Sequence, residues 1–153
     1  MIETNQPAPD FTVPSTSGDD VTLSALRPAP VVLFFYPRDN TSGCTKEAIA
    51  FSHLLEDFAA AGVHVFGVSK DSMKSHGKFV EKQNLTVPLL SDENGTVCED
   101  YGVWAEKKMY GKTFMGIVRS TVLIGADGNI ARTWPKVKVD GHAEEVLEAA
   151  KAL

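Results

Sequence analysis

Apolar side chains in the first half of the chain form two dense runs separated by a segment of helical periodicity. Residues 31–36 are Val-Val-Leu-Phe-Phe-Tyr and residues 63–68 are Val-His-Val-Phe-Gly-Val, which is typical of strands buried on both faces. Between these runs, apolar residues recur at steps of three and four from Ala48 to Phe58. This spacing predicts an amphipathic helix, which we expect to end at Gly62 because glycine commonly follows a helix.

The rest of the chain alternates further helical and extended patterns with turn signals. The Asp-Gly pair in the turn at 126–129 is typical of a β-hairpin. For 102–118 we predict a glycine-containing, aromatic-rich loop. The other predicted elements are an extended segment at 11–23, a helix at 72–83, an extended piece at 87–90, a turn at 92–95, a short helix at 96–101, strands at 120–124 and 130–134, and a helix at 143–153.

The predicted order of elements is β-α-β-α-β-β-α, preceded by an N-terminal extension. Strands that alternate with helices and end in a hairpin and a helix predict an α/β fold with a mixed central sheet flanked by helices. This order is that of a thioredoxin-like fold. The 153 residues contain no repeat and no linker-like stretch, so we expect a single domain over 1–153.

Composition narrows the class of protein. The net charge of −5 and the scattered lysines and arginines disfavour nucleic-acid binding. Every apolar run is far shorter than the roughly 20 residues of a membrane span, and the first ten residues do not resemble a signal peptide. We therefore expect a cytoplasmic protein. Two cysteines are too few for a disulfide framework and in such a compartment are better interpreted as acting thiols.

Cys44 is the leading candidate for chemistry because it lies in the predicted first turn of a helix. The strand at 31–36 ends at Pro37, and Thr41 or Ser42 is the expected N-cap. Unpaired backbone N–H groups and the positive end of the helix dipole favour a thiolate at this position. A free cysteine is often only a small buried apolar residue, but the helix start favours the reactive interpretation.

The segment around Cys44 resembles a known family. Pro37-x-x-x-Thr41-x-x-Cys44 resembles the peroxidatic motif of the peroxiredoxins, and residues 36–48 are similar to the subgroup called bacterioferritin comigratory protein or peroxiredoxin Q. Four further segments resemble that subgroup in the same order: Pro88–Glu93, Tyr101–Trp104, Lys108–Gly111 and Arg119–Ile124. The resemblance covers nearly the whole chain.

The resemblance implies a thiol peroxidase. The Cys44 thiolate would attack a hydroperoxide and become a sulfenic acid, with no metal or organic cofactor. The Thr41 hydroxyl would orient the peroxide, although helix capping alone would also explain that residue. The Pro37 ring would shield the thiolate from water, or Pro37 would simply end the strand.

Glu47 and Arg119 form a second expectation. Glu47 lies three residues after Cys44 on the same helix face, where an unpaired carboxylate would oppose the thiolate. A cation is therefore needed nearby, and Arg119, at the start of a predicted strand, is the candidate. The family pattern implies an arginine against the sulfur, held by a glutamate like Glu47; the alternative is an exposed charge at a strand edge. Arg38 either assists or is solvated.

Resolution of the sulfenic acid departs from the commonest pattern of the subgroup. Many members carry a second cysteine at the position of Ile49, and others carry it in the next helix, where this chain has Phe79 and Val80. Only Cys98 remains, and a buried structural role for it is favoured. We expect a one-cysteine cycle that uses thioredoxin, glutaredoxin or glutathione, with a Cys44–Cys98 disulfide as the alternative. The resemblance suggests a monomer or weak dimer.

Other cysteine-based functions fit the sequence less well. A thioredoxin-type disulfide oxidoreductase is disfavoured because the chain has no CxxC and has Ser120, not proline, before Thr121. A redox sensor that uses Cys44 remains an alternative. His53 lies on the opposite side of the predicted helix from Cys44 and cannot serve a Cys–His hydrolase.

The remaining histidines and aromatic residues carry weaker expectations. We interpret His64, His76 and His142 as ordinary surface or core residues, and no spacing resembles a zinc site. Trp104, Tyr110, Phe114 and Met115 are expected to pack as core under a loop, with docking of a reductase or second subunit as the alternative.

Overall fold

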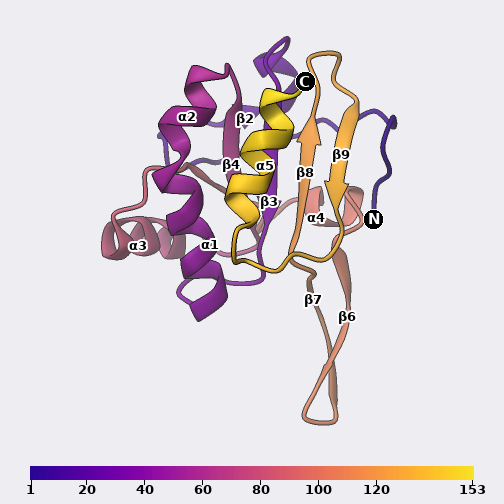
Figure 1. The fold of residues 1–153 in the computed structure, drawn as a ribbon. Helices are drawn as coiled ribbons and strands as arrows, with labels where there is room; N and C mark the ends of the chain where they lie inside the picture. The colour runs from indigo at the N-terminus through magenta and orange to yellow at the C-terminus, as the bar shows by residue number, and fades with distance from the viewer.

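A five-stranded sheet in the order β5-β4-β3-β8-β9 forms the centre of the structure, a computed structural model that describes residues 1–153 (Figure 1). Three strands are parallel: β3 (Val31–Phe35), β4 (His64–Ser69) and β5 (Leu89–Ser91). Two more strands continue the sheet: β8 (Ser120–Ile124) pairs antiparallel with β3, and β9 (Ile130–Trp134) pairs antiparallel with β8. The predicted α/β architecture with a mixed sheet is confirmed.

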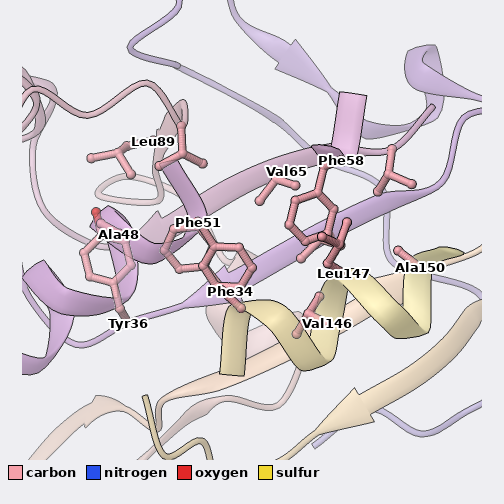
Figure 2. Packing of buried hydrophobic residues seen from close by; sticks show 14 of the residues in the cluster. Phe34, Tyr36, Ala48, Phe51, Phe58, Val65, Leu89, Val146, Leu147 and Ala150 are labelled. Atoms are coloured by element: carbon pink, nitrogen blue, oxygen red, sulfur yellow. The ribbon is translucent and has the colours of Figure 1, made fainter. Parts of the chain in front are cut away.

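Side chains of β3 alternate between two cores on opposite faces of the sheet. Phe34 points to the face covered by α1 (Ser42–His53), α2 (Leu55–Ala60) and α5 (His142–Lys151). There its ring stacks on Phe51 with centroids 4.4 Å apart (Figure 2). Burial of such rings stabilises the packing of α1 on the sheet, each ring by about 2 kcal/mol or more.

The other face of the sheet carries the second core. Leu33 and Phe35 pack there with residues of the N-terminal segment and of α4 (Val97–Asp100). The N-terminal segment forms a small hairpin of β1 (Thr12–Val13) and β2 (Val21–Thr22), followed by a 3-10 turn η1 (Leu23–Leu26). The two cores therefore share only the sheet between them.

The helix α3 (Met73–Gln83) begins as the sequence predicts. Ser72 is its N-cap, and the Ser72 hydroxyl oxygen accepts a hydrogen bond from the Ser75 N–H at 3.1 Å. None of the helices combines the length and apolar character that a transmembrane span requires.

The single helix predicted from the turn of Cys44 to Gly62 is wrong in its continuity, because the chain forms α1 and α2 with a break at Leu54. At this break the Ser52 carbonyl accepts a hydrogen bond from the Thr86 hydroxyl at 3.2 Å. A contact with a segment distant in sequence thus competes with the helical pattern, and periodicity alone cannot reveal it.

The loop predicted at 102–118 is also wrong. Strands β6 (Trp104–Met109) and β7 (Lys112–Ile117) pair antiparallel as a hairpin that projects from the body (Figure 1). Tyr110 and Gly111 form its two-residue turn with φ of 53° and 74°, the positive values that a type I′ turn requires. The outer half of the hairpin is exposed on both faces, so no apolar alternation marks it in the sequence.

The aromatic residues of this hairpin do not form a core, which corrects our expectation. Tyr110 is 96% exposed, and Phe114 and Met115 are also exposed. Only Trp104, near the base of the hairpin, packs against the second core. The predicted core packing therefore fails for three of these four residues.

Candidate active site

The Cys44 site forms where β3 ends and β8 begins. After β3, the chain turns at Pro37 and enters α1 at Ser42, so Cys44 lies in the first turn of that helix. Antiparallel pairing sets Phe35 of β3 opposite Ser120, the first residue of β8. Arg119, one residue earlier, is therefore delivered to the same end of the sheet as Cys44.

The structure brings Cys44, Glu47 and Arg119 together. Arg119 Nη2 donates a hydrogen bond to Cys44 Sγ at 3.2 Å, and Nη1 donates to Glu47 Oε1 at 2.8 Å. A Cβ atom at Gly43 would lie 3.1 Å from Arg119 Nη2. The glycine thus leaves room for the guanidinium beside the sulfur.

Cys44 and Glu47 are nearly closed to water, whereas the Arg119 side chain is 19% exposed. The exposed fraction is 1% for both Cys44 and Glu47, and Glu47 Oε2 has no hydrogen-bond partner. Burial raises the pKa of Glu47 to about 7, although Arg119 acts in the opposite direction. Burial opposes the charge of Arg119, but Glu47 and Cys44 outweigh it and raise the pKa of the guanidinium above its usual value.

Thr41 is the N-cap of α1, but its side chain does not cap the helix. Its hydroxyl donates to the Arg38 carbonyl at 2.9 Å, and its own carbonyl accepts the first helical hydrogen bond, from the Thr45 N–H at 2.9 Å. The N–H groups of Gly43 and Cys44 therefore have no acceptor within the helix. They can stabilise negative charge at the sulfur or on an approaching oxygen.

A pocket of about 310 Å³ lies beside the segment that leads into α1, although Cys44, Glu47 and Arg119 do not line it. Its lining includes Pro37 and the exposed Arg38 from that segment, and Phe114 and Met115 from β7. Lys107, also in the lining, has a pKa lowered by burial and by the charge of Arg119, whereas Cys44 acts in the opposite direction. The charges of Arg119 and Cys44 thus reach the pocket.

A buried polar network lies beneath the segment that leads to Cys44. The Asp39 carboxylate accepts hydrogen bonds from the Tyr36 hydroxyl at 2.7 Å, the Ser75 hydroxyl at 2.7 Å and His76 Nδ1 at 2.8 Å. His76 Nε2 lies 2.9 Å from the Leu90 carbonyl, to which only a protonated nitrogen can donate. Both ring nitrogens therefore donate, which requires a charged imidazole.

The titration behaviour of this pair follows from its contacts. Burial opposes charge on His76, but Asp39 outweighs burial and raises the pKa of the imidazole. Burial likewise opposes charge on Asp39, and hydrogen bonds from His76, Ser75 and Tyr36 outweigh it and lower the pKa of the carboxyl group. Asp39 is also tied through its N–H to Asp71 Oδ2 at 2.9 Å.

Sequence analysis missed this network and treated His76 as an ordinary residue. The ligand atoms of Asp39, Asp71 and His76 lie within 4.8 Å of one another, which is close enough to bind a metal ion. However, His76 uses both nitrogens as donors and Asp39 Oδ2 already accepts two hydrogen bonds. The donor set therefore fits a hydrogen-bonded anchor better than a metal site.

Cys98 lies in the second core, on the opposite face of the sheet from Cys44. It is fully buried, and the Asp92 carboxylate accepts hydrogen bonds from the N–H groups of Val97 and Cys98 at 3.0 and 2.9 Å. Burial and the charge of Asp92 raise the pKa of the Cys98 thiol well above its usual value. The structure does not bring the two cysteines together.

A mixed sheet that presents a helix-start cysteine to an arginine defines a cysteine-based redox protein of thioredoxin-like fold. Comparison with known proteins agrees with this class. The model of the AhpC/TSA family matches residues 4–133. The chain is 45% identical over 148 residues to peroxiredoxin Bcp of Xanthomonas campestris pv. campestris, covering 95% of this chain and 92% of that protein. It is 45% identical over 150 residues to peroxiredoxin Bcp of Bacillus subtilis, covering 98% and 96%.

Solved structures show the same relationship. The bacterioferritin comigratory protein of Xanthomonas campestris superposes with a TM-score of 0.90 at 42% identity, covering 98% of each chain. A peroxiredoxin Q of Xylella fastidiosa with a cysteine-to-serine substitution gives a TM-score of 0.93 at 40% identity, covering 99% of this chain and 97% of that one.

The chain belongs to the AhpC/TSA family and, within it, to the peroxiredoxins of the bacterioferritin comigratory protein or peroxiredoxin Q subgroup. This membership confirms the resemblance drawn from the motifs and the thioredoxin-like fold, and it supports a thiol-dependent peroxidase activity.

Proposed function

We propose that the protein reduces hydrogen peroxide and organic hydroperoxides through a sulfenic acid at Cys44. The thiolate attacks the terminal oxygen of the hydroperoxide, an S–O bond forms, and the O–O bond breaks to release water or an alcohol after protonation. The hydrogen bond from Arg119 Nη2 to Cys44 Sγ carries this proposal, because it places a fixed cation beside the nucleophile. The Xanthomonas campestris relative is described as having alkyl peroxide reduction activity.

Three groups are suited to stabilise the leaving oxygen. Arg119 and the free N–H groups of Gly43 and Cys44 can donate to it as its charge develops. The Thr41 hydroxyl donates to the Arg38 carbonyl, so its oxygen lone pairs can accept a hydrogen bond from the peroxide and orient it. We assign Pro37, in the pocket wall, the exclusion of water.

We further propose that an external thiol resolves the sulfenic acid, in a one-cysteine cycle with thioredoxin, glutaredoxin or glutathione as reductant. The surroundings of Cys98 support this choice, because its thiol is buried across the sheet and held neutral beside Asp92. A bridge between the two cysteines would require large rearrangement of both cores. Since Cys44 is itself almost buried, its first helical turn must open to admit a protein thiol.

Steady-state turnover with peroxide in excess and a thiol reductant tests the proposal. Cys44→Ser is expected to abolish turnover, and Cys98→Ser, the matched substitution, is expected to retain it. Mass spectrometry after one equivalent of peroxide should find a sulfenic acid or its adduct at Cys44. An intramolecular Cys44–Cys98 disulfide would instead establish the two-cysteine cycle.

A redox sensor remains the second candidate because Cys44 is reactive by geometry whether or not it cycles. A sensor would consume one equivalent of peroxide in a burst and then stop with every reductant supplied. Sustained turnover that depends on Cys44 excludes this function.

A further inference from the structure

Large exposed apolar side chains are concentrated on the β6–β7 hairpin. Apart from the terminal residues Met1 and Leu153, every one lies there. We call this set the hairpin patch, and it consists of Met109, Tyr110, Phe114 and Met115. The strand register puts Met109 and Phe114 on one face of the hairpin and Met115 on the other, with Tyr110 in the turn. Large apolar side chains that gather in one exposed region of a protein mark a site of interaction.

The hairpin is not covered by the rest of the chain. It pairs only with itself as a two-stranded sheet and projects away from the body (Figure 1). An isolated two-stranded hairpin is marginally stable in water, and its outward position exposes backbone edges as well as the patch. A purely structural role does not account for apolar residues at its tip.

The position of the patch indicates what would contact it. Phe114 and Met115 line the same pocket as Pro37 and Arg38, which belong to the segment that leads into the Cys44 helix. Met109 and Tyr110 extend the same element outward from the pocket. A protein that approaches Cys44 from the side of this pocket would therefore contact the hairpin.

The charged residues of the hairpin indicate the chemistry of that partner. The hairpin carries Lys107, Lys108 and Lys112 against the single carboxylate of Glu106, whereas the whole chain has a net charge of −5. The exposed Arg38 adds a further cation at the pocket. A positive surface on an acidic protein attracts an acidic partner and repels a second copy of its own acidic body.

We propose that the hairpin patch, with its lysines, docks an acidic dithiol protein that reduces oxidised Cys44. This rests on the proposed function, because only a cycling Cys44 needs a reductant. One partner thiolate attacks the sulfenic sulfur, forming a mixed disulfide and releasing the oxygen as water. The second partner thiol then attacks its own bridged sulfur, which returns the Cys44 thiolate and leaves the partner as a disulfide, oxidised by two electrons.

Comparison of a protein reductant with a small one tests the proposal. The probes are a bacterial thioredoxin of acidic pI, kept reduced by its own reductase, and dithiothreitol. The test variant combines Met109→Ser with Tyr110→Asn, since asparagine tolerates the positive φ at that turn. Leu153→Ser is the control, because Leu153 is as exposed as Met109, at 58%, and lies at the other end of the molecule (Figure 1).

The test variant should raise the KM for thioredoxin about tenfold or more, as loss of an interface anchor does, with dithiothreitol-supported turnover unchanged. The control should change neither. A second variant, Lys108→Glu with Lys112→Glu, keeps the apolar residues and should weaken the salt dependence of kcat/KM for thioredoxin.

Three results would overturn the docking site. The first is an unchanged KM for thioredoxin in both variants. The second is a loss of dithiothreitol-supported turnover equal to the loss with thioredoxin. The third is concentration-dependent self-association of the wild type that the variants abolish while the KM for thioredoxin stays constant. Absence of turnover in the wild type with either reductant is a different outcome, which contradicts the peroxidase function itself.

Discussion

Cys44 and Cys98 occupy similar positions in the chain's secondary structure and very different chemical surroundings. Both are buried, with exposed fractions of 1% and 0%, and each lies in the first turn of a helix. At Cys44 the first-turn N–H groups are free and a guanidinium faces the sulfur. At Cys98 the N–H groups are already bound by Asp92, whose carboxylate opposes a thiolate.

A helix start alone therefore does not make a cysteine reactive. The macrodipole is available to an anion only where the first-turn N–H groups are unpaired. At α4 the Asp92 carboxylate is that anion, so the thiol beside it is held neutral. Substitution of the groups around each cysteine therefore tests this contrast.

The largest effect is expected from Arg119→Met, which removes the cation beside Cys44. The second-order rate constant with hydrogen peroxide should fall about 10²- to 10³-fold, because a fixed donor to the leaving oxygen is lost. The rate of Cys44 alkylation at neutral pH should also fall, because the donor to the sulfur is lost. Arg132→Met is the control, because Arg132 stacks on Trp134 and is not part of the cluster around Cys44. Unchanged peroxide and alkylation rates would exclude Arg119 from the site.

A second prediction concerns the anchor beneath the segment before Cys44. His76→Gln breaks a buried ion pair and should lower the free energy of unfolding by about 3 kcal/mol at pH 6. Because the pKa of His76 is raised in the fold, its stabilisation is complete below its unfolded pKa and is lost as pH rises through the folded value. Asp39 has a lowered pKa in the fold, so it stabilises the protein at pH values above its unfolded pKa. This stabilisation is lost as pH falls through its folded pKa.

The difference between wild type and His76→Gln should therefore be largest in mildly acidic solution and should shrink as the solution becomes alkaline. Urea unfolding across this pH range measures it. The charged groups that face His76 are Asp39 and Asp71, and Tyr36 and the Leu90 carbonyl complete its surroundings. His142→Gln is the matched control, because burial lowers the pKa of His142 and the neutral ring hydrogen-bonds Thr121. A pH-independent difference for His76→Gln would contradict the ion pair.

The next prediction addresses the other cysteine. Asp92→Ala leaves the N–H groups of Val97 and Cys98 without an acceptor and should cost about 2 kcal/mol of stability, measured by urea unfolding. Glu99→Ala is the control, because Glu99 shares Lys70 with Asp92 but is partly exposed, and its loss should cost less than about 1 kcal/mol. Equal costs would show that the Lys70 pair, not the N–H groups, is what Asp92 contributes.

The elements that the sequence predicts correctly are those buried by the sheet. The run at 31–36 and the first part of the cysteine helix can be recognised from their composition, because apolar periodicity records which faces are covered. The hairpin at 104–117 escapes prediction because its outer half is covered on neither face. Its turn, Tyr110-Gly111, also differs from the Asn-Gly and Asp-Gly pairs that signal a hairpin most clearly.

The residues of the candidate site were likewise predictable from the sequence only in part. Cys44, Glu47 and Arg119 could be proposed from one helix face, a charge argument and a family motif, and the structure brings them into contact. The pairing of Asp39 with His76 joins segments 37 residues apart, and no local pattern encodes such a contact. The hydrogen bond from Thr41 to Arg38 could not be foreseen either, because a capping residue in sequence need not cap in three dimensions.

The smallest effect is expected from Glu47→Gln, which keeps the shape of the cluster and removes a charge. Glu47 has a pKa of about 7 in the fold against an unfolded value of 4.5, so the folded protein holds an extra proton between these values and loses stability as pH rises through them. The substitution should abolish this slope, because the amide does not titrate. Above pH 7 the variant also lacks the carboxylate that offsets Arg119, so Cys44 alkylation should be faster than in wild type by about two- to threefold.

At pH 6 most Glu47 side chains are protonated, and the alkylation rates of Glu47→Gln and wild type should converge. The pH dependence is the decisive part, because a merely steric change would alter both ends of the range alike. Glu93→Gln, an exposed carboxylate outside the cluster, is the control and should show no change at either pH. If the ratio of variant to wild-type alkylation rates stays constant from pH 6 to pH 8, Glu47 holds Arg119 in place but its carboxylate does not offset the charge of Arg119 at Cys44.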